Sequence, residues 1–125
     1  SFSVEEKASL DDLCLIIHDN LRLATGVLSS GDVEGAKRLI AQKDAFRALY
    51  SKVLDDHFRA AHRRQQGALR RSALYVDLIR DLHRINSLIV QAGYPIADAA
   101  GVLRGSRLLT SETAVSQDPP PTEPA

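Results

Sequence analysis

The sequence predicts an all-α protein in which three long helices form an up-down-up antiparallel bundle. The first proline of the 125-residue chain is Pro95, so nothing before it interrupts a helix. Apolar residues recur before Pro95 at spacings that alternate between three and four, which is the pattern of an amphipathic helix. No segment alternates apolar and polar residues in the manner of a half-buried strand.

The first helix is expected over residues 4–29. Ser3 and Glu6 have the spacing of a capping box, in which each side chain satisfies a free backbone N–H of the other residue. Gly31, after two serines, is expected to end the helix. The predicted core stripe of this helix is Leu10, Cys14, Ile17, Leu21, Ala24 and Leu28.

The second and third helices are expected over residues 33–65 and 69–92, with Gly67 in the turn between them and Gly93 as the final stop. Short turns between long helices favour antiparallel neighbours. The predicted apolar side of the second helix is Leu39, Ile40, Phe46, Leu49, Tyr50, Val53, Leu54, Phe58 and Ala61. That of the third helix is Leu74, Leu78, Leu82, Ile85, Ile89 and Ala92.

The end of the chain has a different character. Residues 97–109 are weakly apolar, and we expect a short fourth helix or a strap across the bundle. Residues 110–125 are polar and rich in proline, which is typical of a disordered tail. We therefore divide the chain into a helical domain over residues 1–109 and a tail over residues 110–125.

Composition excludes several functional classes. The chain has 16 basic and 16 acidic residues, whereas nucleic-acid-binding domains usually carry a basic excess. Its single cysteine, Cys14, excludes an internal disulfide, and its place on the predicted core stripe indicates a buried, inert thiol. No apolar run approaches the roughly 20 residues that a membrane span requires.

The sequence contains no motif that predicts catalysis or a cofactor. Its four histidines lack the spacing of a zinc site, and we expect His57 to be a hydrogen-bonded structural residue. The glycines do not follow a strand as those of a phosphate-binding loop do. No Glu-x-x-His pair is present, so a carboxylate-bridged di-metal enzyme is disfavoured. We expect no catalytic residues and no cofactor.

The third helix carries a resemblance to a known family. Residues 74–87 read LYVDLIRDLHRINS, and Tyr94, Pro95 and Ile96 follow as YPI, while residues 42–44 read QKD. These strings resemble the PhoU family of helical bundles. They are most similar to the PhoU-like domain at the cytoplasmic C-terminus of bacterial sodium/phosphate cotransporters. The resemblance covers roughly residues 5–97, and implies one three-helix repeat.

The resemblance also raises the question of a metal. Metal-binding PhoU proteins use acidic pairs four residues apart, and Asp77 and Asp81 have this spacing. However, Ser87 stands where the family signature has a carboxylate, and Lys43 lies near the helix-two partner position, so the metal site is a weak candidate. Two alternatives are a solvated ladder of ion pairs and a contact of Lys43 with Asp77 or Asp81 across the bundle. The polar residues expected in such contacts between helices are Lys43, Asp44, Asp77, Arg80, Asp81 and Arg84.

A basic cluster surrounds the turn between the second and third helices. In an up-down-up bundle this turn lies at the same end as the N-terminus. If a membrane domain precedes Ser1, the cluster faces the membrane and can dock on anionic lipid headgroups or on the transporter's loops. The alternative is a solvated basic turn. The cluster consists of His62, Arg63, Arg64, Arg70 and Arg71.

These features predict a non-catalytic regulatory or assembly domain of a sodium-dependent phosphate symporter, at the cytoplasmic face of the inner membrane. The chain has no methionine and opens with Ser1, so we expect a piece of a longer protein with its membrane domain upstream of Ser1. Since PhoU proteins pack two three-helix repeats, the resemblance implies a homodimer. The alternative function is a soluble PhoU-like phosphate-signalling adaptor that binds metal and contacts a transporter or a sensor kinase.

Overall fold

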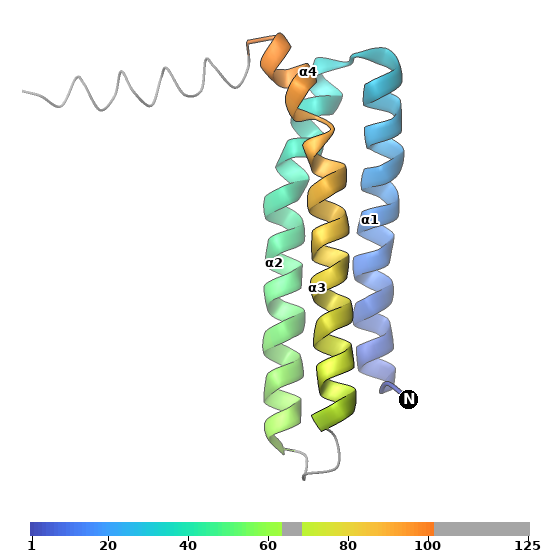
Figure 1. Cartoon of the computed structure of the whole chain (residues 1–125), viewed down its shortest axis with the longest axis vertical. Coiled ribbons are helices and arrows are strands. Elements are labelled where there is room, and N and C mark those ends of the chain that lie inside the picture. The colour runs from blue at the N-terminus through green and yellow to red at the C-terminus, as the bar shows by residue number, and fades with distance from the viewer. Residues whose placement is uncertain (64–68, 102–125) are drawn as a thin grey trace, which may run out of the picture.

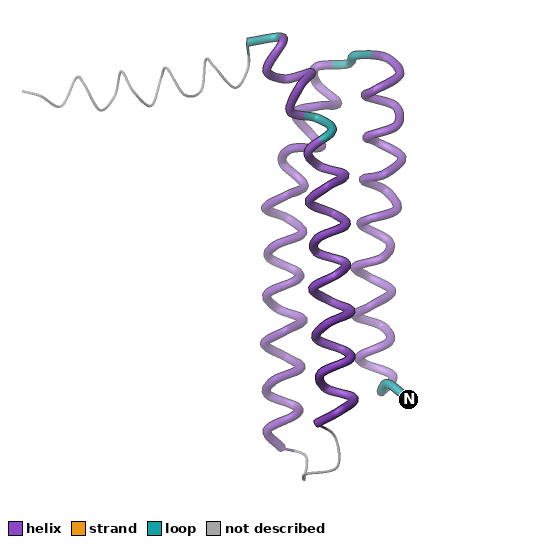
Figure 2. The backbone as a smooth tube through the Cα atoms, viewed as in Figure 1, coloured by secondary structure: helices purple, strands orange, loops and turns teal. Residues whose placement is uncertain are grey.

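A computed structural model describes residues 1–63 and 69–101 of the chain, and it confirms the all-α class (Figures 1 and 2). Helix α1 spans Val4–Ser30, α2 spans Val33–Arg63 and α3 spans Leu69–Gln91. The three lie side by side, with α1 and α3 running in one direction and α2 in the other (Figure 1). A short helix α4, Tyr94–Ala99, crosses the end of the bundle.

Local signals set the ends of α1. The Ser3 hydroxyl accepts a hydrogen bond from the backbone N–H of Glu6 at 3.1 Å, and the Glu6 carboxylate accepts one from the backbone N–H of Ser3 at 3.2 Å, so the predicted capping box is present. Gly31 ends the helix with φ of 70°, a left-handed conformation that glycine adopts without steric cost. Its N–H donates to the Val27 carbonyl at 2.7 Å.

The fourth helix begins earlier than the sequence predicted. Pro95 lies in its first turn, where a helix needs no N–H from that residue, so the proline starts α4 rather than delaying it. Gly93, at the junction of α3 and α4, lies so close to α2 that a Cβ built on it would be 3.2 Å from the Ala36 carbonyl oxygen. The junction therefore packs against α2. The predicted turn at Gly67, residues 102–109 and the tail over 110–125 lie outside the described residues.

The core is a stack of layers, to which all three long helices contribute. The lower layers contain Leu13, Phe46, Val53, Tyr75 and Ile79. The upper layers contain Ala24, Leu39 and Val90, followed by Val27, Ala36 and Ala97, through which α4 closes the end of the bundle.

The predicted core stripes are partly wrong, chiefly in the first and third helices; on α2 only Phe58 of the predicted set is exposed. Cys14, Leu21 and Leu28 are exposed on α1, where the buried residues are Leu13, Asn20, Ala24 and Val27. Leu74, Leu78 and Ile85 are exposed on α3, where the buried residues are Tyr75, Val76, Ile79, Asn86 and Val90. The apolar arc of each helix is wider than the part that the core can cover. The buried side of each helix also contains an asparagine, so the sequence pattern favoured the neighbouring apolar positions. Cys14 is consequently an exposed thiol and not the buried one expected.

Within the described ranges, no helix is both long and apolar enough to cross a membrane.

Candidate functional site

Two buried asparagines join α1 to α3 in the middle of the bundle. The Asn20 Nδ2 amide donates a hydrogen bond of 2.8 Å to the Asn86 Oδ1 oxygen. The two residues are only 3% and 2% exposed. Buried polar groups are costly unless paired, so sliding one helix along the other would break this bond and leave both amides in an apolar setting. The pair therefore specifies the axial register of α1 against α3.

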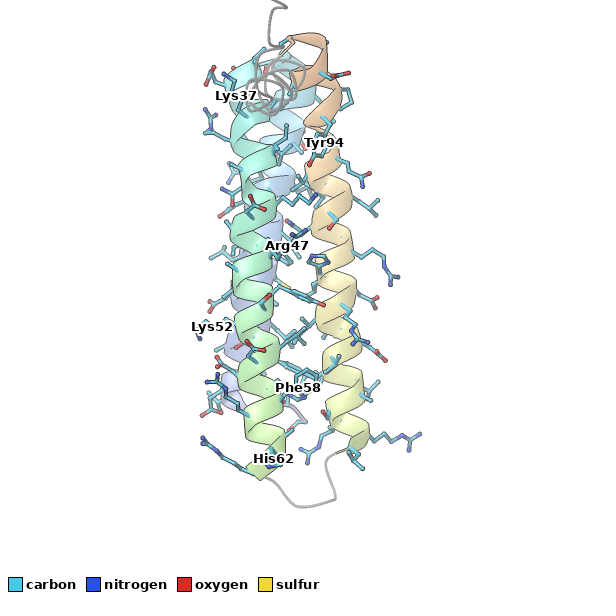
Figure 3. The ribbon with its side chains drawn as sticks, turned by 90° about the vertical axis from the view of Figure 1, so that its left-hand side faces the viewer. Lys37, Arg47, Lys52, Phe58, His62 and Tyr94 are labelled. Atoms are coloured by element: carbon cyan, nitrogen blue, oxygen red, sulfur yellow. The ribbon has the colours of Figure 1, made fainter. Side chains whose placement is uncertain are left out.

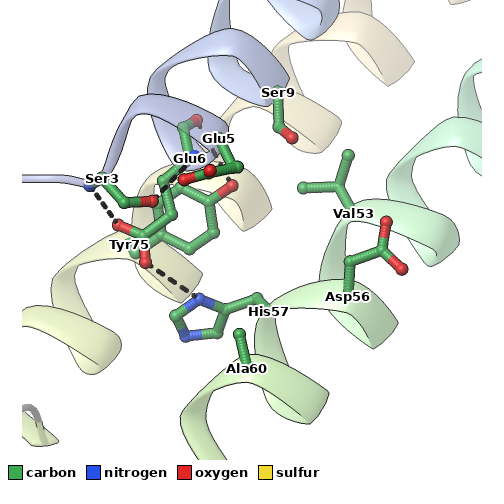
Figure 4. Close-up of a pocket in the computed structure, with 9 residues that line it drawn as sticks. All are labelled: Ser3, Glu5, Glu6, Ser9, Val53, Asp56, His57, Ala60 and Tyr75. Atoms are coloured by element: carbon green, nitrogen blue, oxygen red, sulfur yellow. Dashed lines mark hydrogen bonds and ion pairs between the residues drawn. The ribbon is translucent and has the colours of Figure 1, made fainter. Parts of the chain in front are cut away.

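A cavity of about 360 Å³ opens where the start of α1 meets the end of α2 (Figure 4). It receives carboxylates from two helices, hydroxyls from α1 and α3, and a histidine from α2. Its lining residues are Ser3, Glu5, Glu6, Ser9, Val53, Asp56, His57, Ala60 and Tyr75.

His57 is a buried histidine at this cavity. Its Nε2 atom lies 2.7 Å from the Ser72 hydroxyl oxygen, and its ring centroid lies 4.6 Å from that of Tyr75. The residue is 7% exposed, which confirms the expectation of a hydrogen-bonded structural histidine. Its Nδ1 atom is buried without a hydrogen bond and lies 3.8 Å from Glu6 Oε1. This distance is too long for a hydrogen bond.

Tyr75 closes the floor of the cavity as a protonated phenol. Its hydroxyl donates to the Glu6 carbonyl oxygen at 3.4 Å. Burial raises the pKa of Tyr75, and the negative charge of Glu6 raises it further. The cavity thus combines neutral donors with the carboxylates of Glu5, Glu6 and Asp56.

His83 forms a second polar element, between α2 and α3. Its ring centroid lies 4.5 Å from that of Tyr50 and 5.9 Å from that of Phe46. Burial lowers the pKa of His83, and the positive charge of Arg47 lowers it further. His83 is therefore a neutral, aromatic packing residue near pH 7.

The predicted polar residues of helices two and three lie on the surface. Lys43, Asp44, Asp77, Arg80, Asp81 and Arg84 are all exposed. Among the described residues, the one ion pair that any of these side chains forms joins Arg84 to Asp81 at 3.8 Å, within α3. The structure does not bring Lys43 to Asp77 or Asp81. Helix α2 has ion pairs of the same local kind, Lys37 with Glu34 and Lys52 with Asp56. Figure 3 labels the two lysines on α2.

The two candidate metal ligands, Asp77 and Asp81, are not joined by a third. In residues 1–63 and 69–101, no group of three or more histidine, cysteine, aspartate or glutamate side chains is placed to hold a metal ion.

The basic cluster lies where the topology predicted it. His62, Arg63, Arg70 and Arg71 are exposed around the end of α2 and the start of α3, while Arg64 lies outside the described residues. The Arg71 Nη1 atom donates to the Ser1 carbonyl oxygen at 3.0 Å, and Figure 1 shows the N-terminus at this end of the bundle. The cavity with His57 opens at the same end.

The PhoU domain family matches residues 10–93, which is most of the chain. The chain belongs to the PhoU family. The match includes Asn20, His57 and Asn86 of this PhoU domain, but it leaves out the capping box at Ser3 and Glu6. The resemblance recognised in the third helix is thereby confirmed at the level of the family.

Known proteins similar to this PhoU domain are much longer. It is 33% identical over 98 residues to the "Putative inorganic phosphate export protein YjbB" of Escherichia coli K12, and 34% identical to the protein of that name in Salmonella typhimurium. Each match covers 78% of this chain and 18% of the relative. No solved structure matches the chain significantly.

Sequence reasoning missed the two interior polar sites. Asn20 and Asn86 stand at positions that continue the true buried stripes, seven residues after Leu13 and after Ile79 respectively. That spacing was the available signal. By contrast, Glu6 and His57 are 51 residues apart, and no local pattern predicts their approach.

Proposed function

We propose that this PhoU domain is a non-catalytic regulatory domain of a sodium-dependent phosphate symporter. In this proposal a membrane domain precedes Ser1, the transport site lies in that domain, and the bundle lies at the cytoplasmic face of the inner membrane. Family membership and the phosphate-related name of the relatives support the phosphate link. The short span of the match, 18% of the relatives, is what a domain of a larger protein would give.

The observation that carries the proposal is the position of the basic cluster beside the N-terminus. Three exposed arginines, Arg63, Arg70 and Arg71, lie at the end of the bundle where an upstream domain would join. Each basic residue held at an anionic membrane surface gains about 1 kcal/mol. The cluster would therefore orient the bundle against the membrane.

The first experiment identifies the native polypeptide and its function. An antibody to the domain is used on fractionated cells, and phosphate uptake and export are both followed with labelled phosphate. We expect a band much larger than 13.7 kDa in the membrane fraction, and a changed transport rate when the domain is deleted. A small band in the soluble fraction would refute the fused-transporter proposal and favour the phosphate-signalling adaptor.

The second experiment tests the basic cluster. Flotation with vesicles containing an anionic phospholipid is measured for the purified chain and for a variant with Arg63, Arg70 and Arg71 changed to glutamate. We expect the variant to lose binding, and added salt to weaken binding of the original chain. Unchanged flotation of the variant would contradict the proposal. The control changes the same number of exposed arginines elsewhere, namely Arg22, Arg38 and Arg80.

A further inference from the structure

Large exposed apolar side chains gather on one side of the bundle. Ten such side chains are exposed in the described ranges, and six of them belong to the sides of α1 and α3 that face away from α2. Val4, Leu15, Phe58 and Leu69 are the other four. We call the gathering the α1/α3 face, and its apolar members are Leu21, Leu28, Leu74, Leu78, Ile85 and Leu88.

Helix geometry places the α3 members together. With 3.6 residues per turn, Leu74, Leu78, Ile85 and Leu88 project within one narrow arc of α3. The exposed carboxylate of Asp81 projects in the same arc. His83, whose ring contacts Tyr50 and Phe46 of α2, projects on the opposite side of the helix. The arc therefore faces away from α2.

The α1 members lie beside this arc. Leu21 and Leu28 are seven residues apart, and the exposed thiol of Cys14 precedes them by another seven. Leu23, which packs against the buried cluster that contains Ala36 of α2, projects on the other side of α1. Since the Asn20–Asn86 bond holds α1 against α3, the two apolar arcs adjoin.

The spacing indicates that the partner of this face is helical. Intervals of four, seven and three residues separate the α3 members, and intervals of seven separate the α1 members, as they do where helices pack with side chains interlocked. Isolated exposed leucines need no explanation, but two adjoining stripes of them mark an interaction surface.

The size of the face fits a second copy of the chain. At 1.5 Å per residue, the 23 residues of α3 are about 35 Å long. Two helices 8–10 Å apart, each about 10 Å wide, give a face of roughly 700 Å². A stable interface buries about 800 Å² on each partner. A two-fold axis lets the same face serve both copies, so that the apolar side chains of both are covered at once.

We propose that two copies of the chain pack through their α1/α3 faces about a two-fold axis, which forms a layer of four helices between the two bundles. This assembly does not depend on phosphate or on an upstream membrane domain. It therefore stands or fails separately from the function proposed above.

The test compares two leucines of equal exposure. Leu88 on the face and Leu15 outside it are both 61% exposed, so neither change disturbs the core. Analytical ultracentrifugation of the full chain is run at chain concentrations from about 5 to about 500 µM, so that dimers with dissociation constants in the micromolar range are detected. We expect a dimer for the original chain and for Leu15→Glu. For Leu88→Glu we expect the dissociation constant of the dimer to increase by about 100-fold or more. Its helical circular dichroism spectrum should be unchanged.

Several results would overturn the proposal. A monomer up to the highest concentration would mean that the face is covered by another polypeptide or by none. Equal effects of the two glutamates would mean that the dimer, if present, uses another surface.

The only cysteine gives an independent readout of the same surface, because Cys14 lies on the face and is exposed. The rate of its reaction with a maleimide is measured at increasing chain concentrations, with the maleimide kept in excess at one constant concentration. We expect slower labelling as the dimer forms, and no slowing in Leu88→Glu. Labelling that stays fast in a chain shown to be dimeric would place the interface elsewhere and refute the proposal.

Discussion

Replacing Asn20 with leucine tests the structural role of the buried asparagine pair. Leucine has the same branched side-chain skeleton as asparagine, so the change chiefly removes the amide that donates to Asn86. The Asn86 oxygen would then remain in a site where the residue is 2% exposed. A water molecule has little access to it there, and the change thus leaves a buried acceptor unsatisfied.

The expected magnitude follows from this geometry. An unsatisfied buried polar group costs about 1–3 kcal/mol, so we expect Asn20→Leu to lower the free energy of unfolding by about 2 kcal/mol. For a domain of this size, that corresponds to a fall in Tm of roughly 8–16 °C. Changing Asn86 to leucine as well removes both polar partners, and the double variant should be close to neutral or more stable than the original chain.

The assay is urea unfolding followed by helical circular dichroism, for the original chain, both single variants and the double variant. We expect the sum of the two single losses in unfolding free energy to exceed the loss in the double variant by at least about 2 kcal/mol. Gln91→Leu, on the exposed side of α3, is the control and should change stability by less than about 0.5 kcal/mol. Additive single costs, or a single cost below about 0.5 kcal/mol, would refute the reasoning.

Three further changes test particular contacts. The lowered pKa of His83 means that the unfolded chain binds the proton more readily than the folded chain, so His83 stabilises the fold above its ordinary pKa of 6.5 and loses this contribution as pH falls below that value. His83→Phe should therefore weaken the loss of Tm between pH 7 and pH 5, and an unchanged pH profile would show that the imidazole is not the cause. Gly35→Ala should destabilise by about 1–3 kcal/mol, because the new Cβ would lie 2.8 Å from Val27 Cγ2. In the matched Gly26→Ala, the new Cβ meets nothing within 4 Å, and this change should instead stabilise the fold by about 1 kcal/mol. Equal effects of the two changes in urea unfolding would contradict the close packing of Gly35 against Val27. Ser3→Ala removes the capping hydrogen bond and should cost about 1 kcal/mol in the same assay, whereas no loss would mean that α1 needs no cap.

The candidate site was only partly accessible from the sequence. Helix order alone placed the basic cluster beside the N-terminus. The second helix runs antiparallel to the first, so the turn that follows it lies at the N-terminal end of the bundle. The polar residues of the third helix were identified but lie in solvent, because charged side chains at helical spacing satisfy one another locally, as Arg84 and Asp81 do. The cavity was not predicted, because Glu6, His57 and Tyr75 come from three helices.

By itself, the sequence determined the number of long helices, their lengths and their ends. Those features depend on contacts within a few residues, such as the Ser3–Glu6 capping box and the left-handed Gly31. Only the tertiary structure decided which arc of each helix is buried. The apolar arcs of α1 and α3 are wider than one core face, so periodicity alone admits more than one rotation of each helix. Packing against α2 and the Asn20–Asn86 bond select the rotation that buries Leu13 and leaves Cys14 in solvent.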